Sequence, residues 1–446
     1  MSELLELGER ILGKAEGSGE IELYMVSDRS TDVTIQRSEI NMSRFHVKEL
    51  IGIRVLHDNR LGFASVNSLD ESLILEKLDE ARSLARHSLE DENNVIPSPG
   101  KVSHLEGLYD PGITDFTLDD SLAYAQLFID SALETDARFS LSDGFFSSHD
   151  TERAVVSTLG TGECERSSLF LYMGMGMAVQ GEEISNLDAR AGGSRDIDGI
   201  RVEEVAGKLV ESTVGTLGAE RGESFRGPGI LSPSCLGDML LSGLMVPLKG
   251  NRVLKGMSPL ADMVGERIAS PGFTLRDSSN MPHGLGNRSF DREGMPTPEL
   301  TIVDGGILMS HLHNSYTSHA LKVPNTGHAS GGPRSVPVIA PSNLVMEPGD
   351  SSLESMVRDI PRGILINRFS GEIDPVSGNF SGVVKGGKFV REGEIKHPLK
   401  NMMVSGNIFH MLKGISGVSK DVRRVLNNIH MELPYVLVDD LSFTSG

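Results

Sequence analysis

The chain has 446 residues, 38% of them hydrophobic, and a formal net charge of −20 at pH 7. This length and apolar content are enough for two or three globular domains with real cores. The acidic charge repels phosphate backbones and no segment concentrates lysine and arginine, so we expect no direct nucleic-acid binding.

Signals for membranes, export and disulfides are also missing from the sequence. No apolar run approaches the roughly 20 residues that a membrane helix requires. The start, MSELLELGER, has no basic region followed by an apolar one, so we expect no secretory signal. Cys164 and Cys235 are the only cysteines and lack metal-ligand spacing. A cytoplasmic protein is the default expectation.

The first half of the chain predicts two units of the same kind. An amphipathic helix over 3–15 opens the first unit, and a helix over 70–88 closes it. Between them, polar and apolar residues alternate as in strands over 20–27, 32–38, 50–56 and 62–66. After a linker over 90–112, the second unit has helices at 118–134 and 202–216 around strands at 139–147, 154–158 and 167–179. The repeated order predicts a weak internal duplication.

Beyond Gly222 the chain becomes rich in glycine and proline, which predicts a second domain. We expect an N-terminal α+β domain over 1–221 and a mainly β domain over 222–446. Its expected strands are 300–303, 307–312, 336–339, 363–369, 382–385, 388–390 and 435–439, with a last helix over 407–415. Asp304-Gly305-Gly306 and Lys385-Gly386-Gly387 are typical of hairpin turns. Because strands and helices are segregated, the expected class is α+β.

The best-formed helix of the chain is predicted over 234–246. Ser232 and Ser234 can cap it, and Pro247 must end or kink it near its C-terminal end. One apolar face is formed by Leu236, Met239, Leu240, Leu244 and Leu248. Asp238 is its only acidic residue, and it has no histidine. The helix therefore offers no obvious chemistry of its own.

Histidines gather after the expected strand at 307–312. His311 and His313 share one face by two-residue alternation, and His319 and His328 follow. No acidic third ligand lies nearby in the sequence, so structural roles are favoured over a zinc site. A cleft that grips a peptide is an intermediate hypothesis, with His311, His313, Asn314 and His328 as polar contacts.

Three further motifs favour structural roles. Asp291 and Glu293 are paired carboxylates without a visible partner, so turn formation or capping is expected. Gly174-Met175-Gly176 has Val179 where a dinucleotide fingerprint requires its third glycine, which favours a packing role. The 382–388 segment has phosphate-loop spacing, but Phe389 replaces the Ser or Thr that would hold magnesium, so a hairpin turn explains it better.

Several short motifs, taken in order, resemble the TldD/PmbA family, also called modulators of DNA gyrase. In the second half they are Ser289-Phe290-Asp291-Arg292-Glu293-Gly294, Asn314-Ser315-Tyr316-Thr317, Thr326-Gly327-His328-Ala329, Pro348-Gly349-Asp350 and the segment from Gly371 to Phe380. In the first half they are Gly52-Ile53-Arg54-Val55 and Arg60-Leu61-Gly62-Phe63-Ala64. The resemblance covers nearly the whole chain and implies a two-domain fold.

The resemblance also implies a cytoplasmic metalloprotease complex of two related subunits, of which TldD carries zinc and TldE, also called PmbA, does not. The catalytic subunits resemble one another in His-Glu-x-x-x-His on the helix that opens the C-terminal domain. Aligned through Gly250-Asn251, those positions fall on Leu241, Ser242 and Val246, which can neither bind zinc nor act as a base. The family's cysteine ligand is also missing from 417–421.

These observations favour a TldE/PmbA-like subunit without a catalytic or metal site of its own. Zinc is expected in a TldD-like partner, and the substrate is expected to be an unstructured peptide. Two alternatives remain open at this point. One is a hydrolase that uses His311, His313 or His328, and the other is a homodimeric, non-enzymatic module that binds a protein or peptide.

Overall fold

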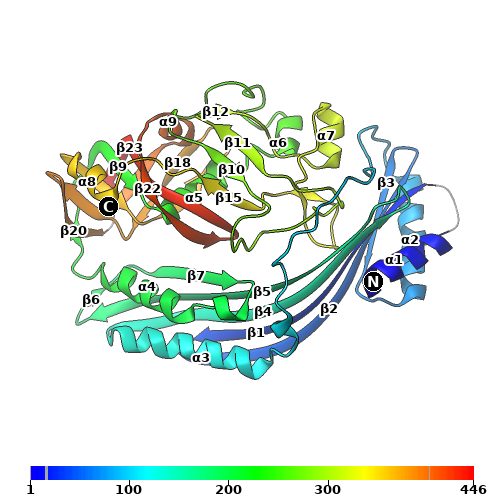
Figure 1. Cartoon of the computed structure of the whole chain (residues 1–446). Helices are drawn as coiled ribbons and strands as arrows, with labels where there is room; N and C mark the ends of the chain where they lie inside the picture. Colours follow the sequence, from blue (N-terminus) through cyan, green and yellow to red (C-terminus); the bar gives the residue numbers. More distant parts are fainter. Residues whose placement is uncertain (1, 16–18, 401) are drawn as a thin grey trace.

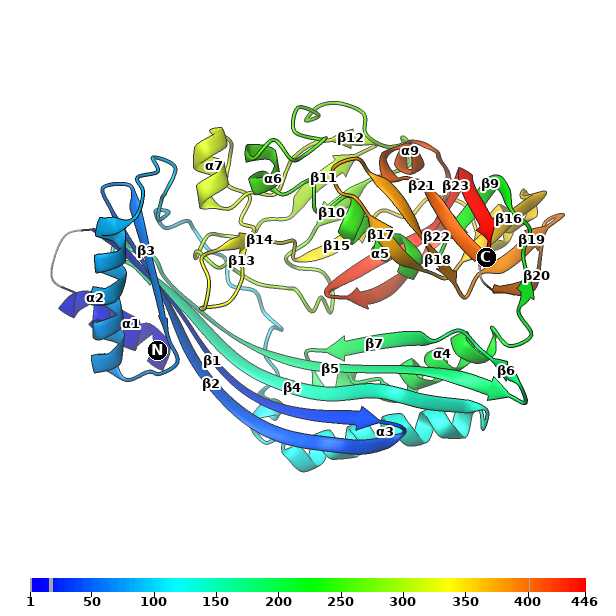
Figure 2. The ribbon, with the colours of Figure 1, turned by 180° about the vertical axis from the view of Figure 1, so that it is seen from behind.

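Two β-sheets face each other in the computed structural model, which describes residues 2–15, 19–400 and 402–446 (Figure 1). The first half of the chain forms a long curved sheet, and the second half folds against the hollow side of that curve (Figure 2). Helices cover the outer side of the first sheet. In the second domain the helix Pro233–Gly243 lies inside, and shorter helices lie at the periphery. The α+β class predicted from the sequence is confirmed.

The first sheet is antiparallel, with the strand order β3-β2-β1-β4-β5 and with β6 and β7 both paired to β5. Its strands are β1 (Glu20–Gln36), β2 (Glu39–His57), β3 (Arg60–Val66), β4 (Phe139–Ser157), β5 (Gly162–Gln180), β6 (Glu183–Ile184) and β7 (Asp188–Ser194).

The strands of this sheet are longer than the sequence pattern predicts. β1 continues through the polar stretch 28–32, where the sequence suggests a break, and β4 likewise continues through 148–153. Asp28 pairs with Lys48 of β2 on one side and with Thr151 of β4 on the other. Backbone pairing on both sides keeps a polar segment extended, so the predicted interruptions are wrong.

Four helices cover the outer face of the sheet in two pairs. They are α1 (Glu3–Lys14), α2 (Glu71–His87), α3 (Leu118–Thr135) and α4 (Val202–Val214). Leu23 of β1 lies in the core beneath α1 and α2, and Val33 lies in the core beneath α3 and α4. Both residues have odd numbers on one strand, so the two cores share one face. The opposite face is left for the second domain.

The expected internal repeat has a counterpart in the fold. A helix, three strands and a helix (α1 to α2) are followed by a helix, four strands and a helix (α3 to α4), and the two sets join through the β1–β4 pair. Gly174 of β5 permits close packing within the second set, because a Cβ there would lie 2.5 Å from the Phe128 ring of α3. The packing role expected for this glycine pair agrees with that contact.

The second domain is built on a branched sheet of 14 strands. They are β8 (Glu220–Arg221), β9 (Phe225–Leu231), β10 (Leu275–Asp277), β11 (Leu300–Asp304), β12 (Ile307–Leu308), β15 (Asn343–Met346), β16 (Arg362–Ile366), β17 (Arg368–Ile373), β18 (Asn379–Lys385), β19 (Lys388–Arg391), β20 (Glu394–Lys400), β21 (Met402–Asn407), β22 (Ile415–Asn427) and β23 (Ile429–Ser445). A separate two-stranded hairpin is formed by β13 (Ala329–Ser330) and β14 (Val338–Ile339). The shorter helical elements are α6 (Gly250–Leu254), α7 (Ser315–Leu321), α8 (Leu353–Arg358), α9 (Ile408–Lys413), η1 (Pro111–Thr114) and η2 (Ile197–Gly199).

The central strand of this sheet is the last one, β23. It pairs with β9, β15, β21 and β22, and it extends well beyond the 435–439 expected from the sequence. β8 already pairs with β20, so the second sheet begins two residues before the expected boundary after residue 221. Glu220 and Arg221, which were assigned to the first domain, therefore pair with a strand of the second sheet.

One of the two predicted hairpin turns is confirmed. Asp304 pairs with Ile307 across Gly305 and Gly306, whose φ values of 50° and 83° are those of a tight hairpin. The hairpin at Lys385-Gly386-Gly387 is wrong, because β18 pairs with β17 and β21 whereas β19 pairs with β16 and β20. The two glycines carry the chain between non-neighbouring strands.

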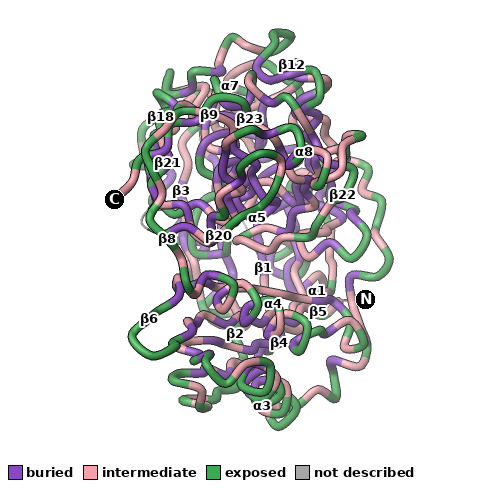
Figure 3. Tube along the Cα trace, turned by 90° about the vertical axis from the view of Figure 1, so that its left-hand side faces the viewer, coloured by how far each residue is buried: buried purple, intermediate pink, exposed green. Residues whose placement is uncertain are grey.

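The central helix, α5 (Pro233–Gly243), lies within the largest hydrophobic core of the molecule, seen as the buried upper part of Figure 3. The Ser232 hydroxyl accepts a hydrogen bond from the Cys235 N–H, as expected of an N-cap. The helix ends at Gly243, four residues before Pro247, so proline does not end it as predicted. Leu244 and Leu248 lie beyond the end of the helix but stay in the core. In the part of the chain that the structure describes, no helix is long and apolar enough to cross a membrane.

Candidate functional site

The three positions aligned with the family's zinc motif lie at the end of α5. Leu241 is half-buried and packs against the main core, Ser242 is exposed, and Val246 is half-buried in the turns that follow. Their side chains offer one hydroxyl and two aliphatic groups. Zinc in proteins takes thiolate, imidazole or carboxylate donors, so this set does not fit zinc.

Asp238 is the only carboxylate on α5, and contacts with other side chains of the protein occupy it. Its Oδ1 accepts a hydrogen bond of 2.6 Å from the Asn427 side chain, and its Oδ2 lies 3.8 Å from Arg368 Nε. Burial raises its pKa, although the Arg368 guanidinium opposes the shift. Arg368 also binds Asp188 of the first sheet at 2.9 Å. Asp238 thus belongs to a network that fixes α5 to both sheets.

The second position of interest in the family, 417–421, lies on β22 beside β23. Ser419 is buried, and its hydroxyl donates to the Asp421 carbonyl at 2.6 Å and accepts from the Tyr435 N–H at 2.9 Å. Both bonds hold the irregular pairing of β22 with β23, where the register shifts. The segment has no cysteine, and its polar side chain has a structural role.

His311 and His313 lie close together, but not on a strand as predicted. β12 ends at Leu308, and only Leu312 between the two histidines makes a bridge, to Lys249. The imidazole centroids are 6.2 Å apart and nearly perpendicular. His311 Nε2 contacts the Leu260 carbonyl at 3.0 Å, and His313 Nδ1 contacts the Thr317 hydroxyl at 3.2 Å. Each ring therefore has a hydrogen-bond partner within the protein.

His313 also supports the turn that follows the degenerate motif. A Cβ on Gly250 would lie 2.4 Å from His313 Nδ1, so the backbone at the start of α6 touches the ring. Burial lowers the pKa of His313 to about 4, and the neighbouring His311 and His328 add to the shift. The imidazole is therefore neutral at physiological pH.

Asn314 and His328 complete the predicted peptide-contact set. The Asn314 side chain caps α7 by accepting from the Thr317 N–H at 3.1 Å. His328 Nδ1 contacts the Thr326 hydroxyl at 2.9 Å, and its Nε2 lies 3.5 Å from Asp277 Oδ1. All four predicted contact residues are at most 5% exposed. The structure brings them together beneath the surface, and the peptide cleft stays a prediction.

Asp291 and Glu293 have partners that the sequence could not reveal. Asp291 Oδ1 accepts from the backbone N–H groups of Glu293 and Met295, and Oδ2 accepts from that of Ala329. This is the turn-forming role expected from the motif. Burial and the nearby Glu293 carboxylate raise the pKa of Asp291 to about 7.

Glu293 joins the two domains through Arg54 of β2. Arg54 Nη1 lies 3.0 Å from Glu293 Oε1, and Arg54 Nε donates to Glu22 Oε1 at 3.0 Å. Arg292 Nη1 reaches the same Glu22 oxygen at 2.9 Å, and its guanidinium stacks on Tyr24 at 3.9 Å. All four charged side chains are at most 6% exposed. This network was not predicted from the sequence, although charges at Glu22 and Arg54 inside apolar strands were a signal of buried pairing.

Burial and charge pull the pKa values of this network in opposite directions. Burial raises the pKa of Glu22, but Arg54 and Arg292 outweigh it and hold that pKa below its ordinary value. Burial also lowers the pKa of Arg54, and Glu22 and Glu293 more than reverse that effect. The ionised forms are the ones that hold the two sheets together.

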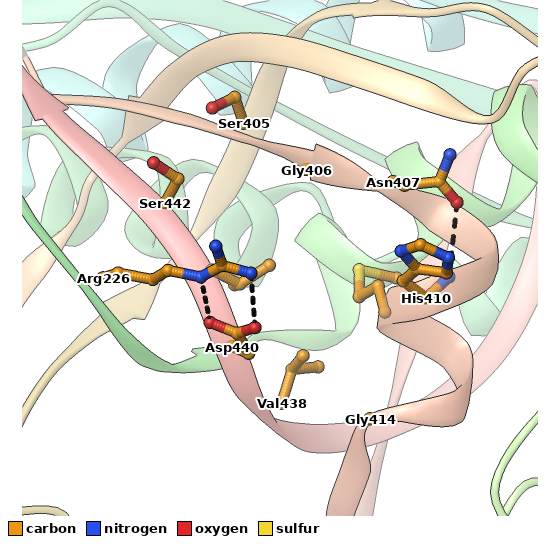
Figure 4. A pocket seen from close by; sticks show the side chains of 11 residues that line it. Arg226, Ser405, Gly406, Asn407, His410, Gly414, Val438, Asp440 and Ser442 are labelled. Carbon is orange, nitrogen blue, oxygen red and sulfur yellow. Dashed lines mark hydrogen bonds and ion pairs between the residues drawn. The ribbon is translucent and has the colours of Figure 1, made fainter.

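An open pocket of about 310 Å³ is lined by residues of β9, β21, α9 and β23 in the second domain (Figure 4). Arg226 and Asp440 form a two-point ion pair across it, with one contact of 2.6 Å, and His410 and Asn407 lie on its other side. None of the predicted site residues lines it. No group of three His, Cys, Asp or Glu side chains in the described ranges is placed to hold a metal ion.

Comparison with known proteins identifies the family. Residues 225–445 match the PmbA/TldA metallopeptidase C-terminal domain, and residues 21–86 match PmbA/TldA metallopeptidase domain 1. The chain belongs to the TldD/PmbA family. It is 27% identical to a metalloprotease PmbA homolog of Buchnera aphidicola, over 92% of this chain and 90% of the relative. It is 24% identical to metalloprotease PmbA of Escherichia coli O157:H7, over 95% and 91% of the two chains.

The fold of the TldD/PmbA chain also matches a solved structure. TldE from Thermococcus kodakarensis superposes with a TM-score of 0.90 over 99% of each chain, at 23% sequence identity. At that identity the match establishes the shared fold. The family resemblance seen in the sequence motifs is therefore confirmed across nearly the whole length.

Proposed function

We propose that this chain is the zinc-motif-deficient subunit of a TldD-TldE-type metalloprotease complex. The observation that carries the proposal is the end of α5, where Leu241, Ser242 and Val246 stand in place of two ligands and a catalytic base. The absence of cysteine from 417–421 supports the same conclusion independently. In this proposal zinc belongs to a TldD-like partner, and both subunits are cytoplasmic.

The proposed role of the chain is to shape the peptide channel of that partner. Its α5 is fixed by the core on one side and by the Asp238–Arg368–Asp188 network on the other. Leu241, Ser242 and Val246 offer no thiolate, imidazole or carboxylate, and Cys235 and Asp238 of α5 are buried or held by other residues. The end of this helix can therefore form a wall beside a metal site without competing for the ion. The substrate would be an unstructured peptide, held mainly through its main chain, which gives little sequence specificity.

Co-expression with a TldD-like chain tests the proposal. We expect a stable complex by size-exclusion chromatography, with zinc bound in the complex and in the partner but not in this chain alone. Cleavage of an unstructured peptide should need the complex. One zinc per isolated chain together with peptide cleavage by that chain would contradict the proposal.

A different outcome would support the binding-module alternative. If the chain forms a stable dimer with itself and no complex with any TldD-like chain, it acts without the protease. His313→Ala in the reconstituted complex provides a further check, since unchanged cleavage is expected when the buried imidazole has only a structural role. Loss of cleavage with an intact, zinc-loaded complex would favour a hydrolase that uses the histidine cluster.

A further inference from the structure

Part of the first sheet has an open edge next to the second domain. β3 pairs only with residues 51–57 of β2, so residues 39–50 pair with β1 on one side and with no strand of the described chain on the other. Alternate residues of such an edge direct their backbone N–H and C=O groups outward, where another extended chain can bind them.

The side chains of this edge are unusually apolar for an unprotected strand. Phe45 is 54% exposed and Val47 is 55% exposed, and their spacing of two residues places them on one face. Arg29 of β1 lies 6.0 Å from the Phe45 ring. Proteins usually protect open edges with proline, charges or a covering loop. The stretch from 43 to 47 has no proline and no covering segment of the described chain, and Arg44 is its one permanently charged residue.

A groove of about 510 Å³ lies where the open edge meets the second domain. It is lined by Val47, Lys48, Glu49, Leu50, Asn67, Gly332, Pro333 and Arg334. The loop of the β13–β14 hairpin forms its wall and rests on β2, since a Cβ on Gly52 would lie 2.5 Å from the Pro333 carbonyl oxygen. Figure 2 shows this hairpin beside β3. A strand added to β2 would continue the line of β3 into the groove.

The charges of the edge from Arg44 to the groove favour an anionic partner, while Glu39 lies at the far end of the edge beside the β1–β2 turn. Arg44, Lys48 and Arg334 are exposed, and none makes an ion pair within 4 Å in the described residues, although the chain as a whole carries −20. Lys48 faces Asp28 across the strands, but Thr151 and His149 already bind that carboxylate. Arg44 faces Asp32, which His46 contacts at 3.5 Å. Glu49 is the one acidic residue that lines the groove. Because successive side chains of a strand point to opposite faces, it lies on the other face of β2 from Lys48.

We propose that residues 39–50 of β2 bind an extended, acidic polypeptide segment as an added strand, with apolar side chains alternating with Asp or Glu. Main-chain hydrogen bonds would supply affinity, Phe45 and Val47 would contact the apolar side chains, and Lys48 and Arg334 would select acidic ones. A second copy of this chain fits less well, because it would bring another Arg44, His46 and Lys48 to the same short edge. The proposal concerns the isolated chain and stands apart from the protease complex.

Fluorescence anisotropy with the purified full-length chain tests the proposal. The probe is a labelled octapeptide of alternating glutamate and valine, compared with a lysine-valine octapeptide and with two acidic peptides methylated on alternate amides, one for each edge. We expect the acidic peptide to bind at least about tenfold tighter than the basic one, and one of the two methylated peptides to lose about tenfold.

Variants of the chain locate the binding site. Lys48→Glu with Arg334→Glu should weaken binding of the acidic peptide by about tenfold, and Lys388→Glu, an exposed lysine on β19, should not change it. Circular dichroism shows whether each variant is folded. The proposal is overturned by an absence of saturable binding up to about 1 mM peptide, by equal affinity for all methylated forms, or by a self-dimer that Phe45→Glu dissociates.

Discussion

Arg54 belongs to the buried network of charged side chains that joins the first sheet to the second domain. It contacts Glu22 of its own sheet and Glu293 of the second domain, and all three side chains are buried. Removing one member of a buried ionic network leaves the others charged without compensation, which costs much more than the network contributes.

We therefore expect Arg54→Met to lower the free energy of unfolding by about 3–5 kcal/mol. Urea unfolding followed by circular dichroism measures the change. Arg226→Met is the matched control, because its ion pair with Asp440 is exposed, and little change is expected. Equal effects of the two substitutions would show that the Arg54 network is not structural.

His313 predicts a pH dependence of stability. Its pKa of about 4 in the folded chain is below the usual 6.5, so the unfolded chain binds more protons between these values. The contribution of this residue to stability should rise by about 3 kcal/mol as pH increases from about 4 to 6.5, whereas Asp291, with its pKa raised to about 7, contributes in the opposite direction over the same range. Denaturant midpoints of wild type and His313→Gln across this range measure it. Parallel curves would contradict the prediction.

For single residues, the structural role could be predicted from the sequence more often than the hydrogen-bond or ion-pair partner. Asp291 was expected to form a turn and does so, because the N–H groups of Glu293 and Met295 that it accepts from lie two and four residues along the chain. Arg54 could not be paired in advance, since Glu22 and Glu293 come from different domains. The histidines clustered as their spacing suggested, but their burial follows from loops that no periodicity describes.

At the scale of elements, glycines fix how closely helices approach strands. A Cβ on Gly62 of β3 would lie 1.9 Å from the Ala81 carbonyl oxygen of α2, so the helix rests on the bare backbone of the strand. Gly207 of α4 has nothing within 4 Å of the equivalent position. A side chain would therefore collide with α2 at Gly62, whereas there is room for one at Gly207.

Gly62→Ala should lower the free energy of unfolding by more than about 2 kcal/mol, because α2 must move away from the sheet. Gly207→Ala should raise it by about 0.5–1 kcal/mol, since alanine favours the helix and meets no obstacle. Thermal unfolding of both variants compares the signs. A stabilised Gly62→Ala chain would contradict the packing described for α2.

Elements were predictable where their pattern is local. The helices over 70–88 and 118–134 and the hairpin at Gly305-Gly306 follow from capping, amphipathicity and turn residues. Strand lengths were not predictable, because residues 28–32 of β1 stay extended only through neighbours on both sides. The end of α5 was misplaced for a similar reason, since the core and not Pro247 turns the chain.

For the whole molecule, composition and element order were enough for the class and the two-part organisation. How the two parts pack against each other could not be predicted, since it depends on buried charges that are far apart in the sequence. Arg195 illustrates this at a second place: its guanidinium donates to the carbonyls of Gly284, Leu285 and Asn287 in the second domain. Polar contacts of this kind hold the curved sheet against its neighbour.

The central position of β23 has a consequence for synthesis. The ribosome completes the first sheet and its helices by residue 214, while β9, β15, β21 and β22 still lack the strand that they share. The edges that these strands turn toward β23 stay open until Ile429–Ser445 has been synthesised. A chain truncated before Ile429 would therefore leave the edges of these four strands unpaired and open to association with other chains.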